Sequence, residues 1–400
     1  MAKSFSTTSD IGQKYPYSPA DKGKINSIVQ ETVSLIIENG DTFEYIYNTW
    51  QKRHTGDAPL GKSLLFSLGS QSVSNSKGIH VLATGEGGYG KSDGITQMGD
   101  LVFPDYWKNG DVTPQSLYYC GPEMPDSVVV GLEDVVWESK LGVSVKRITS
   151  AFQVGASKTT TIEMKGENVR TAKGIAFWAS CADNEADEQL RDRFLMHCVK
   201  ADLERRRAII RHMQAQDEGE QLPGEHEFET LVCQALTYDL KHKLYYVKIP
   251  FSKKIKFEGD PRAYAIFSDM IKSSAVFRYS KREADEVGRL YATEEDFENA
   301  RELYIELGGH DRDKYSDPEL KVLNAIISNG GEATQADIQK LAKRSSGFVS
   351  DILNGRGKMG HGLLYKCRYL VVTDGKPKKY QLSSGFNPTA NVVIDLEEPT

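Results

Sequence analysis

The stretch Val81-Leu-Ala-Thr-Gly85-Glu-Gly-Gly88-Tyr-Gly90-Lys91-Ser92 predicts the fold of this chain. A short apolar run leads into the pattern G-x-x-x-x-G-K-S, and a helix is expected to start there. Glycines let successive backbone N–H groups turn toward a phosphate chain, and the helix N-terminus adds the positive end of its dipole. The pattern therefore indicates a P-loop. A glycine-rich turn without a ligand is the alternative interpretation.

A P-loop implies ATP and Mg²⁺ as cofactors. Lys91 is expected to reach the β- and γ-phosphates, and the Ser92 hydroxyl is expected to bind the metal. The predicted nucleotide-binding residues are Gly85, Glu86, Gly87, Gly88, Tyr89, Gly90, Lys91, Ser92 and Asp93.

A second apolar run, Ser127-Val-Val-Val-Gly-Leu-Glu133-Asp134, ends in two carboxylates. A buried strand with acids at its tip can hold Mg²⁺ and polarise the water that attacks a phosphate. We expect Glu133 and Asp134 to be catalytic and assign the metal to Glu133 and Ser92. The usual order is Asp then Glu, so the inversion leaves open which acid serves the metal and which the water. An ordinary acidic turn is the alternative.

Composition sets the class of protein. A chain of 400 residues with 39% hydrophobic and 26% charged residues is expected to be soluble and to form two or three domains. The net charge is −6, yet residues 318–385 hold eleven Lys and Arg against five Asp and Glu. Such a basic module can face phosphates. Five separated cysteines and the lack of a long apolar run predict a cytoplasmic protein without zinc or membrane contact.

Periodicity predicts alternating helices and strands around the P-loop, which is the pattern of a parallel α/β sheet. The expected helices cover residues 25–37, 42–53, 60–70 and 143–152. The expected strands cover residues 79–83, 175–180 and 194–199, and a hairpin is expected to turn at Lys165-Gly166.

The C-terminal half reads as mostly helical. Residues 202–247 are expected to be helical with a break at 219–224, and two more helices are expected within 262–307. Helices at 317–331, 334–343 and 346–353, followed by a hairpin at 369–382, predict a winged helix. The arginines 205–207 share a segment with acids, so we expect a solvated helical face there.

This order of parts resembles the AAA+ core of the minichromosome maintenance (MCM) replicative helicases, in the short form found in mobile genetic elements. The resemblance covers roughly residues 60–382. Gly85–Ser92 matches Walker A, and residues 128–134 are similar to Walker B. Lys165-Gly166 lies where MCM proteins carry a hairpin that tracks DNA in a central pore.

The resemblance also implies roles for three further residues. Asn184 lies where sensor 1 is expected, although Ser180 or Asp183 can fill that position. Arg193, in Asp-Arg-Phe, matches the arginine finger, and Arg262, in Asp-Pro-Arg, matches sensor 2. A surface ion pair of Arg193 with Asp187 or Asp192 and a solvated arginine at 262 are the alternatives.

The sequence departs from the family before Walker A. About eighty residues precede it, too few for the OB-fold and zinc-bearing domain of the family. The hairpin turn is one residue shorter, and the Walker B acids are swapped.

The expected organisation is an N-terminal lead with helices at 1–59, an AAA+ core at 60–200, a helical lid at 201–310, a winged helix at 317–385 and an acidic tail at 386–400. The expected DNA-binding residues are Lys158, Lys165, Arg170, Lys173, Lys343, Arg344, Ser346, Arg356, Lys358, Lys376, Lys378 and Lys379.

The resemblance predicts an ATP-dependent DNA helicase or translocase that hydrolyses ATP between subunits of a homo-oligomeric ring, expected to be a hexamer, in replication of a genome or mobile element. DNA is the expected partner, and a primase, polymerase or initiator is a further candidate. Two rivals stay open: an AAA+ initiator or loader without processive unwinding, and an AAA+ transcriptional regulator.

Overall fold

A computed structural model describes two compact units. The first comprises Met1–Ile255, Asp260–Leu307 and Leu396–Thr400, and the second comprises Lys256–Gly259 and Gly308–Asp395. The described residues are 19–85, 88–110, 113, 115–119, 123–135, 137, 139–162, 165–181, 188–199, 203–218, 226–257, 261–307, 315, 317–355, 362–367, 370–373, 377–382 and 394–396.

Among the described residues, from 19 onward, three helices precede the P-loop strand, and strands then alternate with helices, as predicted. The elements up to the P-loop helix are α2 (Pro19–Asn39), α3 (Thr42–Arg53), α4 (Ala58–Ser70), β1 (His80–Thr84) and α5 (Lys91–Gly99). They are followed by β2 (Trp107–Asn109), α6 (Ser116–Tyr119), β3 (Val129–Leu132), α7 (Ser139–Ser150), β4 (Ser157–Ile162), β5 (Lys165–Arg170), β6 (Ala176–Ser180), α8 (Glu188–Arg191) and β7 (Phe194–Cys198). The helix expected at 143–152 therefore begins and ends a few residues earlier.

The central sheet has five parallel strands in the order β2-β3-β6-β1-β7. Every residue of β1, β3 and β6 is buried, which explains why these strands are continuous apolar runs. Strand β6 lies between the P-loop strand β1 and the acid-bearing strand β3. Their carboxyl ends therefore meet at one edge, with the end of β6 between the P-loop and the acids.

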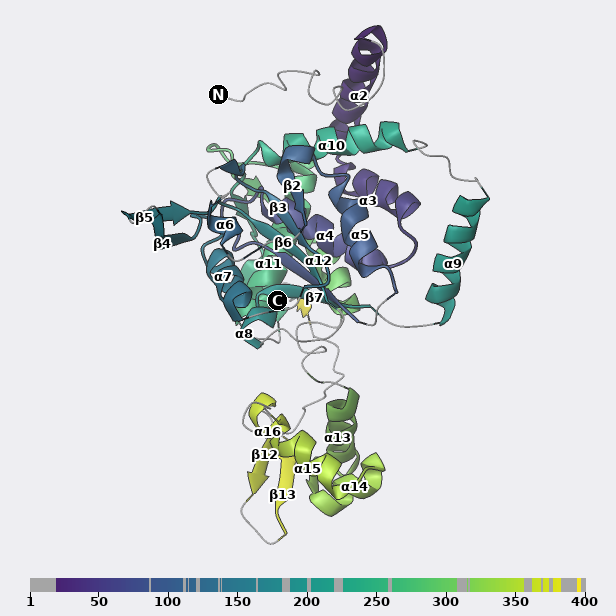
Figure 1. Ribbon diagram of the computed structural model, residues 1–400, viewed down its shortest axis with the longest axis vertical. Coiled ribbons are helices and arrows are strands. Elements are labelled where there is room, and N and C mark those ends of the chain that lie inside the picture. The colour runs from purple at the N-terminus through teal and green to yellow at the C-terminus, as the bar shows by residue number, and fades with distance from the viewer. Residues whose placement is uncertain are drawn as a thin grey trace. The chain divides into compact units, whose positions relative to one another are not determined.

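Helices cover both faces of this sheet (Figure 1). On one face, Leu82, Phe177 and Phe194 join a core with residues of α7, among them Val145 and Ile148. On the other face, the indole of Trp178 donates to the hydroxyl of Ser67 on α4 at 2.9 Å. Side chains of a strand point alternately to its two faces, which is why neighbouring residues of β6 serve different cores.

Strands β4 and β5 form an antiparallel hairpin that projects from the sheet in Figure 1. Lys165 pairs with Ile162, so the connection consists of residues 163 and 164, which lie outside the described residues. The prediction of a turn at Lys165-Gly166 is wrong by two residues, because both belong to β5. Lys165 still begins a strand beside the connection.

The rest of the first unit is mainly helical and packs on the N-terminal helices. Its elements are α9 (Leu203–Asp217), α10 (Glu227–Lys241), β8 (Val247–Lys248), α11 (Pro261–Phe277), β10 (Leu290–Tyr291) and α12 (Glu294–Glu306), with 3₁₀ turns at Pro104–Tyr106, Ser252–Lys254 and Tyr279–Lys281. Strand β9 (Ile255–Phe257) begins in the first unit and ends in the second. Helix α11 approaches α4 closely, because Gly69 leaves room for the ring of Phe277 and the hydroxyl of Ser273.

The second unit contains α13 (Asp317–Ser328), β11 (Glu332–Thr334), α14 (Gln335–Ala342), α15 (Ser346–Asn354), α16 (Leu363–Lys366), β12 (Leu370–Thr373) and β13 (Lys379–Leu382), and the chain continues to β14 (Ile394–Leu396). Strands β11, β13 and β12 form an antiparallel sheet in that order. The prediction of three helices and a hairpin did not include β11. Thr334 and Ser345 accept backbone N–H bonds at the starts of α14 and α15.

Candidate functional site

The P-loop joins the end of β1 to the start of α5. Gly85 has φ +127° and lies against the carbonyl of Val199, where a Cβ would come within 2.7 Å of the oxygen. Gly90 has φ +79° and directly precedes α5. Lys91 is buried and its Nζ donates to the Gly85 carbonyl at 2.7 Å, across the loop. Of the predicted contacts, Glu86 and Gly87 lie outside the described residues.

The two predicted acids follow β3 directly and lie beside the P-loop helix. Ser180, the last residue of β6, is fully buried, and its Oγ lies 3.0 Å from the Oγ of Ser92. The same Oγ accepts from the backbone N–H of Asp134 at 3.0 Å. One hydroxyl therefore connects the predicted metal ligand of the P-loop with the acid-bearing turn.

Glu133 is held by two polar side chains from other elements. Its Oε1 accepts from Thr96 Oγ1 at 2.9 Å and from Asn109 Nδ2 at 2.5 Å. Thr96 lies on α5 and Asn109 ends β2, so the carboxylate is oriented from both sides. Hydroxyl and carboxylate oxygens are the ligands that Mg²⁺ prefers, so the oxygens of Ser92 and Glu133 fit this ion.

Of the three residues considered for sensor 1, Ser180 alone lies in the described part of the chain. Asp183 and Asn184 lie outside the described residues. Ser180 reaches both the P-loop and the acidic turn, so it is a candidate for sensor 1, and the assignment of Asn184 stays a prediction.

Arginines of α9 contact the P-loop. Arg205 Nη2 donates to the carbonyl of Tyr89 at 2.8 Å, and Arg206 Nη2 donates to the Tyr89 hydroxyl at 2.6 Å. The guanidinium of Arg206 also lies over the Tyr89 ring, 5.2 Å from its centroid. The expectation of a solvated face at residues 205–207 is therefore wrong for Arg205, whereas Arg206 and Arg207 are exposed as predicted.

A buried carboxylate anchors this contact. Asp57 Oδ2 accepts from Arg205 at 2.7 Å, and Asp57 Oδ1 lies 2.5 Å from His197 Nε2 on β7. Burial by itself would raise the pKa of Asp57, but the hydrogen bonds from His197 and Arg205 outweigh burial and lower it to about 2. The carboxylate is thus charged and ties α9 and β7 to the segment before α4.

A second histidine, His54, contacts the first turn of the P-loop helix α5. His54 is buried, and its Nδ1 lies 2.7 Å from Asp93 Oδ2 in the first turn of α5. The indole of Trp50 packs on the His54 ring and donates to the Gly94 carbonyl at 2.9 Å. Asp93, a predicted nucleotide contact, is therefore held by α3.

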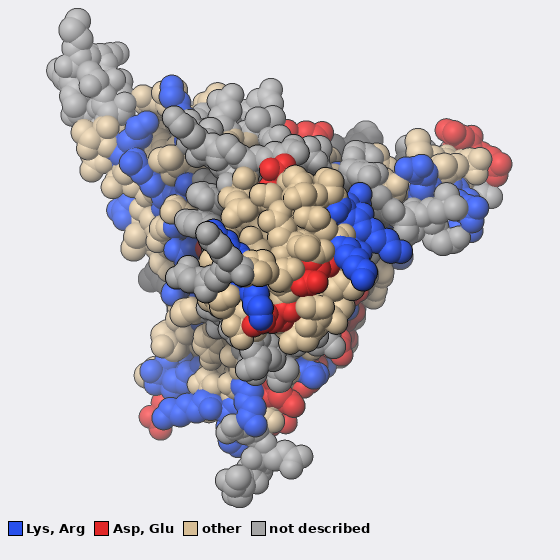
Figure 2. All heavy atoms as spheres, turned by 90° about the horizontal axis from the view of Figure 1, so that it is seen from below, with Lys and Arg blue, Asp and Glu red and all other residues tan. Residues whose placement is uncertain are grey.

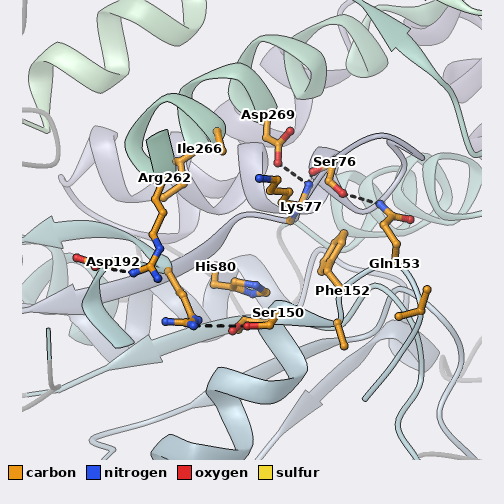
Figure 3. Close-up of a pocket in the computed structure, with 16 residues that line it drawn as sticks. Ser76, Lys77, His80, Ser150, Phe152, Gln153, Asp192, Arg262, Ile266 and Asp269 are labelled. Atoms are coloured by element: carbon orange, nitrogen blue, oxygen red, sulfur yellow. Dashed lines mark hydrogen bonds and ion pairs between the residues drawn. The ribbon is translucent and has the colours of Figure 1, made fainter. Parts of the chain in front are cut away.

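The opposite edge of the sheet holds a cavity of about 470 Å³, to which both predicted arginines contribute. Arg193 precedes β7 and Arg262 lies in the first turn of α11. Arg262 Nη1 donates to Asp192 at 2.8 Å, and Arg193 donates to the carbonyl of Gln189 and to Ser150 Oγ at 3.5 Å (Figure 3). The structure thus brings together two residues that lie about seventy positions apart.

The two arginines lie far from the P-loop of their own chain. His80, the first residue of β1, lines the cavity, whereas Gly85 follows the last residue of the same strand. Four residue steps of a parallel strand span about 13 Å. The cavity with Arg193 and Arg262 therefore lies at the opposite end of β1 from the P-loop of the same chain.

Three of the basic residues predicted to bind DNA lie on the strands of the β4–β5 hairpin, and Lys173 lies just after it. Lys158 lies on β4 with its Nζ 5.6 Å from the Tyr118 ring centroid, and Lys165 begins β5. Arg170 ends β5, and both Arg170 and Lys173 are exposed. The hairpin therefore carries cations along both strands.

In the second unit, cations gather at the start of α15. Lys343, with φ +52°, directly follows α14, and the Arg344 guanidinium lies over the Phe348 ring, 5.2 Å from its centroid. Lys343, Arg344 and Ser346 are exposed. Lys378 is also exposed, whereas Lys379 pairs with Glu332 at 2.5 Å. Arg356, Lys358 and Lys376 lie outside the described residues.

Figure 2 shows Lys and Arg side chains in several separate groups on the face in view, with Asp and Glu groups beside them. Contact with a nucleic acid would therefore depend on local groups of cations, in keeping with the net charge of −6.

Several residues of the site were not predicted. Thr96, Asn109, Asp57 and His54 occur in no recognisable motif, and they reach the site only because distant elements pack together. The acids beside Arg205–Arg207 in the sequence favoured solvent exposure, so the contacts of Arg205 and Arg206 with Tyr89 were not predicted. An arginine cluster in the segment after the last core strand is the single signal that could have indicated it.

Among the described residues, none of the helices combines the length and apolar character that a membrane crossing requires. A family model described as the MTBMA_p00010 P-loop domain matches residues 27–243, which is more than half of the chain. A search among curated proteins finds no match. The family match and the parallel sheet together identify the core of a P-loop NTPase, as the Gly85–Ser92 motif predicted.

Proposed function

The chain belongs to the MTBMA_p00010 P-loop domain family, and from this premise we propose that it is an AAA+ ATPase of MCM-like type that translocates on DNA as a homo-oligomeric ring. One observation carries the proposal: a P-loop with an acidic turn lies at the carboxyl edge of the sheet, while two arginines lie at the amino edge, about 13 Å of strand away.

In this proposal the two edges belong to two different ATPase centres. Phosphoryl transfer depends on positioning and on cations around the γ-phosphate. Lys91 supplies one cation from the chain that holds the nucleotide, and Arg193 and Arg262 of the next copy supply others. Each centre is complete only at a contact between copies, so hydrolysis requires assembly.

The reaction is hydrolysis of the β–γ anhydride of ATP. The oxygen of a water attacks the γ-phosphorus, the bond from that phosphorus to the bridging oxygen breaks, and ADP and inorganic phosphate leave. The water's proton passes to a carboxylate of the acidic turn, Glu133 or Asp134. Mg²⁺, held through Ser92 and Glu133, would neutralise charge on the phosphate oxygens.

DNA contact is proposed for two regions. The β4–β5 hairpin places Lys158, Lys165 and Arg170 on strands that project from the core. The helices and the three-stranded antiparallel sheet of the second unit support the proposal of a winged helix, in which Lys343 and Arg344 lie just before α15. Cations in such positions contact backbone phosphates, which gives a sequence-independent and salt-dependent grip.

The test combines assembly with unwinding. We expect a closed oligomer in the presence of ATP and DNA by electron microscopy, and strand displacement on forked DNA that Lys165→Ala reduces while ATPase activity persists. Turnover at full rate by a monomer under all conditions would contradict the ring. ATPase activity without any displacement by the unmodified chain would indicate an initiator or loader instead of a helicase.

A further inference from the structure

Lys77 lines the same cavity as Arg193 and Arg262. It lies in the segment between α4 and β1, and its side chain is exposed. Among the described residues, none forms a hydrogen bond or an ion pair with its ammonium group. Figure 3 shows Lys77 beside Ser76 and Asp269 among the residues that line the cavity.

The backbone that carries Lys77 is held in place by side chains. The Lys77 N–H donates to Asp269 Oδ2 at 2.7 Å, and Gln153 Nε2 donates to the Ser76 carbonyl at 2.8 Å. Gly78, with φ +85°, packs on the Phe152 ring so closely that a Cβ would come within 2.4 Å of it. Because its backbone is already fixed, Lys77 loses less conformational entropy when it binds a ligand.

The acids of the cavity are already paired, so they do not neutralise Lys77. Asp269 Oδ1 accepts from Lys272 at 2.9 Å, and Asp192 accepts from Arg262 at 2.8 Å. Burial, together with the smaller effect of the Arg193 charge, lowers the pKa of His80 to about 3, so this ring is neutral at pH 7. The cavity therefore has an excess of positive charge, which favours an anion.

We propose that Lys77 is a third cation of the trans site, contacting an oxygen of the terminal phosphate of the nucleotide held by the next copy, beside Arg193 and Arg262. This inference rests on the proposed function and names a further catalytic residue for it. In the transition state, charge spreads over three equatorial oxygens of the transferred group, so several cations can act at once. Lys77 forms and breaks no covalent bond in this step.

The experiment compares ATP turnover of Lys77→Met and Lys77→Arg with that of the unmodified chain, under conditions in which the oligomer forms. We expect Lys77→Met to lower kcat about 10-fold. This loss is smaller than the roughly 10²–10³-fold loss typical of a buried oxyanion donor, because Lys77 is exposed. Lys77→Arg should recover most of that loss. The affinity of the P-loop for ATP and the unfolding midpoint should not change.

Lys253 provides a matched control. It is an exposed lysine of the first unit, on the 3₁₀ turn Ser252–Lys254, and it does not line the cavity. Lys253→Met should retain the turnover of the unmodified chain.

Mixed oligomers separate this inference from the proposed function. A Lys91→Ala copy has a defective P-loop but an intact amino edge, so it should restore turnover when mixed with either Arg193→Ala or Lys77→Met. If Lys77→Met keeps full turnover alone, or is not restored while Arg193→Ala is, the inference about Lys77 is wrong and the proposed function stands. If Arg193→Ala is not restored either, the shared site fails and Lys77 fails with it.

Discussion

The two edges of the parallel sheet hold sites of opposite construction. At the carboxyl edge, the proposed phosphate contacts come from one contiguous loop, Gly85–Ser92, in which Gly85, Gly88 and Gly90 have positive φ. At the amino edge, the cavity is assembled from four separate segments, three of which contribute a long cationic side chain: Lys77, Arg193 and Arg262. A site made of backbone N–H groups has to be continuous in sequence, whereas a site made of side chains depends only on which elements pack together.

The largest effect should come from Lys91→Ala, which breaks the carboxyl edge. Lys91 is the one cation of the P-loop motif, so ATP hydrolysis should fall to background in a phosphate-release assay. DNA binding by the full chain without nucleotide should be retained, as measured by fluorescence anisotropy. A variant that still hydrolyses ATP would show that the P-loop is not the catalytic centre.

Arg193→Ala should remove the proposed trans cation at the amino edge and leave the P-loop at the carboxyl edge intact. We expect kcat to fall by roughly 10³–10⁵, because an arginine supplied in trans contributes on this scale. Equilibrium binding of a fluorescent ATP analogue should be unchanged, since about 13 Å of strand separates Arg193 from the P-loop of its own chain. Loss of nucleotide binding would mean that the two edges are not independent.

Asp57→Asn tests the support beneath the carboxyl edge. Asp57 has φ 64°, a conformation that Asn tolerates, so the variant removes the charge and keeps the backbone. Loss of the buried carboxylate leaves Arg205 and His197 without their partner and should lower the free energy of unfolding by about 3 kcal/mol in urea titrations.

The effect of Asp57 has a defined pH dependence. Its pKa is lower in the folded chain, about 2, than the usual 3.8. The stabilisation is therefore present above pH 4 and is lost as the pH falls toward 2. A difference between variant and unmodified chain that does not shrink over this range would contradict the ionised pair.

His80→Phe sharpens the description of the amino edge. His80 takes up a proton when the chain unfolds, because its pKa rises from about 3 in the folded state to the usual 6.5. Stability should therefore fall by about 1.4 kcal/mol per pH unit as the pH drops from 6.5 toward 3. Phe fits among the rings of Phe152, Phe177 and Phe194 and should flatten this slope. An unchanged slope would mean that another group titrates.

Much of the fold was predictable from local pattern. The helices α3 and α4 and the strands β1, β6 and β7 fall within a residue or two of the expected positions, because apolar periodicity reports burial directly. Errors arose where a pattern was short. The turn at Lys165-Gly166 was misplaced by two residues, and β11, with three residues, gave no signal.

The sequence by itself determined the P-loop, the acidic turn and the assignment to the P-loop NTPases, because each depends on neighbouring residues at a fixed spacing. Only the tertiary structure decided that Ser180 bonds to both Ser92 and Asp134 and that Arg205 donates to the carbonyl of Tyr89. It also decided that Lys77 shares a cavity with Arg193 and Arg262. The physical reason is range: backbone geometry follows from adjacent residues, whereas the partner of a side chain depends on how distant elements pack.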